Sequence, residues 1–168
     1  MKLIQALPKD SDKILEILQA ASKFLAEQGI NQWQNNYPNQ IIVENDINDG
    51  ISYILVNDQD QILSVAVLDT KPDPNYNTIK DGHWLSEQPY ATIHRIATNP
   101  EHTGKGVAKA TFASLIEQAK QLGFKEIRID THPNNLIMQH LIKTTGFVYC
   151  GIVTISDQSK RFAYQLFI

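Results

Sequence analysis

The hydrophobic and polar positions of this chain follow two periods, and each period predicts a different kind of element. Between Ser11 and Gly29, apolar residues recur at helical spacing, which is typical of a helix with one buried face. Short apolar or alternating runs bounded by turn residues predict strands. We expect strands over residues 2–6, 52–56, 61–68, 91–98, 126–131, 147–155 and 161–167. We expect helices over residues 11–28, 39–48, 108–122 and 135–145.

Polar, turn-forming residues separate these elements. The stretch Asn57-Asp58-Gln59-Asp60 joins two expected strands and is typical of a hairpin. Residues 69–89 form a long segment rich in Pro, Asn and Asp, and loops of this length in compact domains are usually functional or disordered. Because helices alternate with strands and hairpins also occur, the pattern predicts an α/β fold with a mixed sheet.

Composition and charge exclude several classes of protein. With 168 residues, of which 42% are hydrophobic, the chain is long enough for a single domain over residues 1–168 with a full core. A net charge of −3 argues against nucleic-acid binding, which favours a basic surface. The chain shows neither a signal pattern nor an apolar run of about 20 residues, so we expect a cytoplasmic protein that does not enter a membrane.

Cysteine and histidine usage narrows the chemistry further. Cys150 is the single cysteine and falls in an expected strand, so we expect a buried thiol and no disulfide. No pair among the five histidines has the spacing of a zinc site, so we expect no metal.

A glycine turn follows the expected strand Ala91–Thr98 and precedes the expected helix 108–122. Gly104 and Gly106 allow the backbone to bend and to approach a ligand closely, and free N–H groups at a helix start favour an anion. The turn lacks the third glycine of the dinucleotide fingerprint, and Val107 stands where a Walker loop has Lys. The turn therefore indicates a phosphorylated small molecule, with an ordinary turn as the alternative.

The stretch from Ile93 to Gly151 resembles the core of the GNAT N-acetyltransferase superfamily. A strand leads into the Gly-Lys-Gly turn and a helix, and the next helix starts with Asn135 and ends in Gly146-Phe147. The resemblance implies a GNAT-like acyl-CoA acyltransferase fold, with a mixed central sheet of about seven strands and about four helices. It is similar to small bacterial members of unassigned acceptor, and it implies acetyl-CoA as the cosubstrate.

The resemblance also implies which residues hold the cofactor. Strand backbone is expected to pair with the pantetheine arm and to polarise the thioester carbonyl, the turn is expected to bind the pyrophosphate, and Asn135 is expected either to contact the cofactor or to cap its helix. These residues are Ile96, Ala97, Thr98, Thr103, Gly104, Lys105, Gly106, Val107, Ala108, Lys109 and Asn135. Two positions depart from the family pattern: Glu101 stands where an Arg or Gln usually opens the loop, and Ile142 replaces a Tyr that serves many members as general acid.

An amine acceptor must lose a proton before it attacks, and histidine is the usual base near neutral pH. His94 lies on the core strand shortly before the residues implied to pair with pantetheine, so we expect it to be the catalytic base; a buried core histidine is the alternative. By strand alternation, Arg95 is expected to point to the opposite face. The general acid is left open between Tyr149, His132 and water.

Aromatic residues and one histidine are the candidates for binding the acceptor, although packing of helices onto the sheet would also explain the aromatic ones. These residues are Trp33, Tyr37, Trp84, Tyr90 and His132. The apolar closing strand that ends at Ile168 would suit either a monomer with a covered sheet edge or a homodimer paired across that edge.

Together these observations predict a cytoplasmic acyltransferase. We expect it to move the acetyl group of acetyl-CoA to a primary amine of a small molecule or peptide by direct attack in a ternary complex. The alternative is a regulatory module that binds acyl-CoA without turnover, which the replacement of Tyr by Ile142 motivates. A generic nucleotide-binding domain is a third hypothesis.

Overall fold

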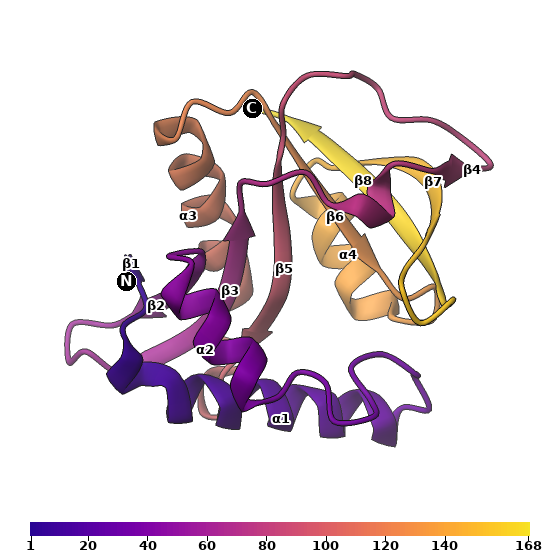
Figure 1. Ribbon diagram of the computed structural model, residues 1–168. Helices are drawn as coiled ribbons and strands as arrows, with labels where there is room; N and C mark the ends of the chain where they lie inside the picture. Colours follow the sequence, from indigo (N-terminus) through magenta and orange to yellow (C-terminus); the bar gives the residue numbers. More distant parts are fainter. The chain divides into compact units, whose positions relative to one another are not determined.

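A computed structural model describes residues 1–168, which form two compact units. The first unit contains residues 1–68 and 95–115, and the second contains residues 69–94 and 116–168. The strand β5 (Ala91–Thr98) and the helix α3 (Val107–Gln121) each contribute residues to both units. Figure 1 labels the helices and strands of both units.

The first unit opens with a three-stranded antiparallel meander. β1 (Lys2–Gln5) pairs with β2 (Ser52–Val56), and β2 pairs with β3 (Ile62–Asp69) across the expected hairpin. Directly after β5, the backbone N of Asn99 donates to the carbonyl of Leu63 on β3 at 2.8 Å. Two helices, α1 (Ser11–Glu27) and α2 (Gln40–Asn48), precede β2, as the helical spacing predicts.

The core of the first unit forms where α1 and α2 pack on the meander. The buried apolar residues of the two helices meet those of the strands and of β5 in one cluster. Its buried members are Ala6, Ile14, Ile17, Leu18, Val43, Ile47, Ile54, Val56, Val65 and Ala97. Trp33 packs against the outside of this cluster. Burial of these side chains is the main contribution that holds the helices against the strands.

The second unit contains the parallel pair and three further strands. Its strands are the start of β5, then β6 (Glu126–Thr131), β7 (Val148–Thr154), β8 (Lys160–Phe167) and a two-residue strand, β4 (Ile79–Lys80), and its remaining helix is α4 (Leu136–Thr144). Hydrogen bonding follows the order β1-β2-β3-β5-β6-β8-β7-β4, so the sheet is mixed and has eight strands. The strand beyond the expected seven is β4, which lies inside the long segment 69–89.

The closing strand does not lie at a sheet edge. β8 pairs with β6 on one side and with β7 on the other, both antiparallel. The expectation that this strand offers an edge for a second copy, or needs a cover, is therefore wrong. Its apolar residues are explained by its central place within the unit.

The parallel pairing of β5 with β6 is short. It joins Ala91 to Ile127 and Thr92 to Arg128, and it ends there although both strands continue. Hence the ladder covers only the start of β5.

The long segment 69–89 is ordered over one face of β6. Alternate residues of a strand share a face, and on β6 the polar face carries Glu126 and Arg128, both buried. The Ser86 hydroxyl donates to the Glu126 carboxylate, and Arg128 Nη2 donates to the Ser86 carbonyl at 2.8 Å. The Arg128 guanidinium also lies 4.3 Å from the ring centre of Trp84 and 3.9 Å from that of Tyr90. These contacts hold segment 69–89 in place, so of the two expectations for this loop, functional or disordered, it is not disordered.

Two glycines allow this segment to approach β7. A Cβ on Gly82, whose φ is +158°, would lie 2.0 Å from the carbonyl oxygen of Cys150. A Cβ on Gly151, with φ of +144°, would lie 2.6 Å from the carbonyl oxygen of Lys80. Only glycine fits either position. Cys150 itself is free and buried, as expected.

Candidate active site

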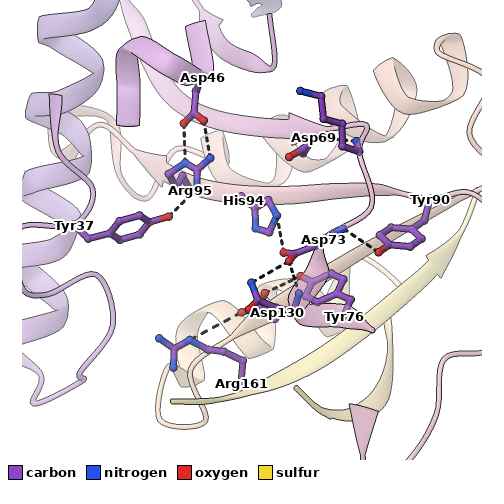
Figure 2. A network of polar contacts seen from close by, with 12 residues as sticks. Tyr37, Asp46, Asp69, Asp73, Tyr76, Tyr90, His94, Arg95, Asp130 and Arg161 are labelled. Atoms are coloured by element: carbon purple, nitrogen blue, oxygen red, sulfur yellow. Dashed lines mark hydrogen bonds and ion pairs between the residues drawn. The ribbon is translucent and has the colours of Figure 1, made fainter. Parts of the chain in front are cut away.

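His94 faces a carboxylate from the long segment. Its Nε2 lies 3.4 Å from Asp73 Oδ2, as Figure 2 shows. Asp73 is held in turn by Asn75, whose backbone N and side-chain Nδ2 donate to Asp73 Oδ1 at 2.8 and 2.9 Å. The backbone N of Asp73 donates to the Tyr90 hydroxyl at 3.1 Å. Burial works to raise the pKa of Asp73, but the hydrogen bonds from His94 and Asn75 outweigh it, so the pKa lies below its ordinary value.

A second carboxylate belongs to the same cluster. The Tyr76 hydroxyl donates to Asp130 Oδ2 at 2.7 Å, and Arg161 Nε lies 4.0 Å from Asp130 Oδ1 (Figure 2). Burial raises the pKa of Asp130 above its ordinary value, although His94, Tyr76 and Arg161 act against this rise. Burial also raises the pKa of Tyr76 well above its ordinary value, and the Asp130 charge adds to the effect. Tyr76 is therefore a neutral phenol at neutral pH.

This cluster can perform acid–base chemistry. The His94 side chain is 21% exposed, so a ligand can reach it. With Nε2 beside Asp73, the ring nitrogen Nδ1 is left to accept a proton from a substrate. A carboxylate that orients an imidazole and stabilises its protonated form is a recurring arrangement for a general base.

Arg95, the next residue on β5, has a different set of partners. Its Nε and Nη2 both donate to the carboxylate of Asp46 at 2.8 Å, and its Nη1 donates to the Tyr37 hydroxyl at 2.7 Å (Figure 2). Burial works to lower the pKa of Arg95, but Tyr37 and Asp46 outweigh it and raise the pKa. The backbone φ of Arg95 is +45°, so β5 is not a regular strand at this point and simple alternation does not describe it.

The glycine turn presents free backbone donors. Gly104 and Gly106 have φ of +74° and +75°, and a Cβ on either would meet no atom within 4 Å, so the space beside them is open. The backbone N of Ala110 donates to the Gly106 carbonyl at 3.0 Å, whereas the backbone N–H groups of residues 104–109 have no acceptor within the protein. Free N–H groups in an open turn at a helix start favour a phosphate.

The other residues expected at the cofactor are divided between the surface and the core. Lys105 and Lys109 are exposed, and Lys105 Nζ donates to the Glu101 carbonyl at 3.4 Å. Val107 is buried and packs with Leu55 and Leu63. Ile96 and Ala97 are buried, Thr98 and Ala108 are half-buried, and Thr103 is exposed.

Asn135 and His132 lie close together at the start of α4. Asn135 Oδ1 accepts from the backbone N of Met138 at 3.1 Å, so the helix-cap alternative is confirmed. His132 Nδ1 accepts from the backbone N of Asn134 at 3.1 Å. Burial lowers the pKa of His132, and the Arg161 charge adds to the effect. His132 is therefore neutral at neutral pH.

The aromatic residues expected at the acceptor are engaged in internal contacts. Trp33 packs on the core of the first unit, which agrees with the alternative that the aromatic residues serve packing. Tyr37 is 37% exposed, and its hydroxyl accepts a hydrogen bond from Arg95. Trp84 donates through Nε1 to the Tyr76 carbonyl at 2.9 Å, and both Trp84 and Tyr90 lie against Arg128. The rings of Trp84 and Tyr90, which were candidates for binding a cationic ligand, thus already contact the guanidinium of Arg128.

Sequence reasoning missed the partners of His94. Asp73 and Tyr76 lie in a segment without a periodic pattern, and Asp130 follows the alternation of an ordinary strand. The polar face of β6 was the one available signal, because a buried strand with acidic residues on one face needs a polar cover. No group of three or more His, Cys, Asp or Glu side chains is arranged to hold a metal ion, and no helix is both long and apolar enough to cross a membrane.

Comparison with known proteins gives a consistent result. The model of the acetyltransferase (GNAT) family matches residues 15–147. The chain is 31% identical to a GNAT-family acetyltransferase of Streptococcus agalactiae, with a TM-score of 0.92 over 99% of this chain and 95% of that one. No curated protein sequence matches.

Two more distant structures share the fold. A GNAT-family acetyltransferase of Listeria monocytogenes is 18% identical with a TM-score of 0.77, over 99% of this chain and 94% of that one. The ribosomal-protein-S18-alanine N-acetyltransferase of Escherichia coli is 14% identical with a TM-score of 0.66, over 99% and 93%.

Proposed function

The chain belongs to the acetyltransferase (GNAT) family, and we propose that it moves the acetyl group of acetyl-CoA to a primary amine of a small molecule or peptide. Family membership supports acetyl transfer in general. The observation that carries the finer proposal is the pairing of His94 with Asp73 on the strand that leads into the open glycine turn. The family match crosses both units, which supports a single domain over residues 1–168.

Acetyl-CoA fits the residues that the turn presents. The free N–H groups of residues 104–109 suit its pyrophosphate, and Lys105 and Lys109 add positive charge at the surface. The backbone of Ile96, Ala97 and Thr98 is proposed to pair with the pantetheine arm and to polarise the thioester carbonyl. The early end of the β5–β6 ladder supports this, since it leaves the later part of β5 for an extended ligand. Asn135 caps α4 and is proposed to contact the cofactor as well.

His94 is proposed to take the proton from the acceptor ammonium. Asp73 orients the imidazole and stabilises its protonated form, and the amine then attacks the thioester directly in a ternary complex. Exposed Tyr37 and half-buried His132 are proposed to contact the acceptor. Trp33, Trp84 and Tyr90 are half-buried and are proposed to contribute to the same binding.

A second candidate is a module that binds acyl-CoA without turnover. Ile142 stands where many family members have the tyrosine that protonates the leaving thiolate, and it is fully buried. Tyr149 is 44% exposed and packs edge-on against Tyr164. If the chain is an enzyme, the general acid is therefore proposed to be Tyr149, His132 or water.

The non-catalytic module, by contrast, predicts binding of acetyl-CoA with no release of CoA in the presence of any amine.

Thermal unfolding with acetyl-CoA, and with ATP and NAD as controls, tests the cofactor. A ligand at about 100 times its Kd stabilises the protein by about 2.7 kcal/mol, which corresponds to roughly 5–10 °C for a chain of this size. Stabilisation by acetyl-CoA alone supports the proposal. The absence of a shift at millimolar acetyl-CoA would refute it.

The base is tested once an amine screen for thiol release yields an acceptor. His94→Ala is expected to lower kcat by about 10²-fold or more, because the acceptor loses its base, while the affinity for acetyl-CoA stays the same. His140→Ala, an exposed histidine on α4, is the matched control and should leave kcat unchanged. An unaltered pH profile of the rate in His94→Ala would exclude His94 as the base.

A further inference from the structure

We propose that Arg95 is a positioning residue whose side-chain contacts hold β5 in a left-handed turn directly before residues 96–98. The inference rests on the proposed function, because the residues that follow are those proposed to pair with the pantetheine arm. The evidence is the φ of +45° at Arg95 together with the three hydrogen bonds of its side chain.

A left-handed backbone is unfavourable for arginine. It disfavours a residue with a Cβ by about 5- to 30-fold relative to the right-handed or extended form, whereas glycine adopts it freely. Arginine has no intrinsic preference for this conformation. Contacts of the side chain must therefore select it.

The guanidinium provides such contacts. Asp46 on α2 accepts two parallel hydrogen bonds of 2.8 Å from Nε and Nη2, and Tyr37, just before α2, accepts one of 2.7 Å from Nη1. Asp46 is 8% exposed, so the pair is largely shielded from water. A planar fork held at both ends leaves the Arg95 Cα little freedom, and a lysine could not reproduce this geometry.

The turn interrupts the alternation of side chains along β5. In a regular strand, successive side chains point to opposite faces of the sheet, and this requires extended backbone at every residue. Arg95, with φ of +45°, is not extended. The alternation is therefore broken at Arg95, directly before the section of β5 proposed to pair with the cofactor.

The test compares Arg95→Ala with Arg95→Gly. Both variants lose the guanidinium, but only glycine accepts φ of +45° without strain. The probes are acetyl-CoA, which would contact both the glycine turn and β5, and adenosine 3′,5′-bisphosphate, which lacks the pantetheine arm. Affinities are measured by calorimetry, with Glu16→Gln as the control for loss of an exposed ion pair.

For Arg95→Ala we expect about tenfold weaker binding of acetyl-CoA and unchanged binding of the bisphosphate. Arg95→Gly should recover most of this loss and should unfold at a higher temperature than Arg95→Ala. A side chain that merely packs would give the reverse order, because glycine removes more contacts and adds flexibility, and that result overturns the proposal. Equal acetyl-CoA affinity in the wild type and Arg95→Ala also overturns it while leaving the proposed function intact. If the wild type fails to bind acetyl-CoA, the proposed function falls, and this inference falls with it.

Discussion

Replacement of Glu126 by glutamine tests whether a buried ion pair holds the long segment on β6. Glu126 is fully buried. Its Oε1 accepts from Arg128 Nε and Nη2 at 3.2 and 3.0 Å, and its Oε2 accepts from Gln165 Nε2 at 2.9 Å and from the Ser86 hydroxyl. The backbone N of Leu85 in turn donates to Gln165 Oε1 at 2.9 Å. Every neighbour of this carboxylate is thus a donor.

A glutamine cannot satisfy this arrangement in either orientation. If the NH₂ group of the new glutamine faces Arg128, two donors face each other. If it faces Gln165, the Gln165 amide must rotate to accept from it, and the Gln165 NH₂ group then faces the backbone N–H of Leu85, which is again a donor. The substitution also leaves the buried Arg128 charge without its partner. Loss of one member of a buried pair costs about 3–5 kcal/mol. At roughly 2–4 °C per kcal/mol for this chain length, Tm should fall by about 6–20 °C.

Differential scanning calorimetry of Glu126→Gln measures the effect. The control is Glu16→Gln, which removes an exposed partner of Lys13 and should cost under about 1 kcal/mol. A double-mutant cycle with Arg128→Met should give a coupling above about 1 kcal/mol, because the two side chains act together. If Glu126→Gln unfolds within about 3 °C of the control, the ion pair does not hold the segment, and the reasoning from donors and acceptors is wrong.

Two further predictions concern stability. Gly82→Ala should lower the free energy of unfolding by about 3 kcal/mol, because the added Cβ would lie 2.0 Å from the Cys150 carbonyl oxygen. The control is Gly123→Ala, whose Cβ would meet no atom within 4 Å and which should cost only about 1–2 kcal/mol. Equal Tm values for the two variants would contradict the close approach. Asp130→Asn should become more stable relative to the wild type as pH rises. The folded-state pKa of Asp130 lies above its ordinary value of 3.8, so the wild type alone loses stability as pH rises from that value through the folded pKa. A Tm difference that shrinks as pH rises over this window would show that the sign is wrong.

Hydrophobic periodicity was sufficient to predict the principal elements of the fold. Long periodic segments such as Ser11–Glu27 and Ala91–Thr98 appear where their patterns indicate, because burial of an apolar face determines the element. The two-residue strand β4 has no pattern of its own; it forms because Ile79 and Lys80 meet Val153 and Ile152 of β7, far along the chain. Pairing between distant short segments leaves no local signal.

The candidate site could be predicted only in part. His94 and the glycine turn were identified from residue type and order alone, whereas Asp73 and Asp46 were not, because their importance depends on which distant residues they face. The left-handed backbone at Arg95 was also beyond sequence reasoning, since arginine normally signals a right-handed or extended conformation and only its tertiary contacts select the other form.

The ends of the strand order bear on how copies of this protein could associate. The outermost strands are β1, with four residues, and β4, with two, so each offers few unpaired backbone groups as a template for another chain. Beyond β4, Gly82 lies close to the Cys150 carbonyl, so the chain covers this part of β7 as well. Short or blocked edges are a general defence against runaway strand addition. If copies of this protein associate, we therefore expect them to do so through side-chain surfaces rather than by extending the sheet, and to remain dispersed at concentrations where an open strand would seed fibrils.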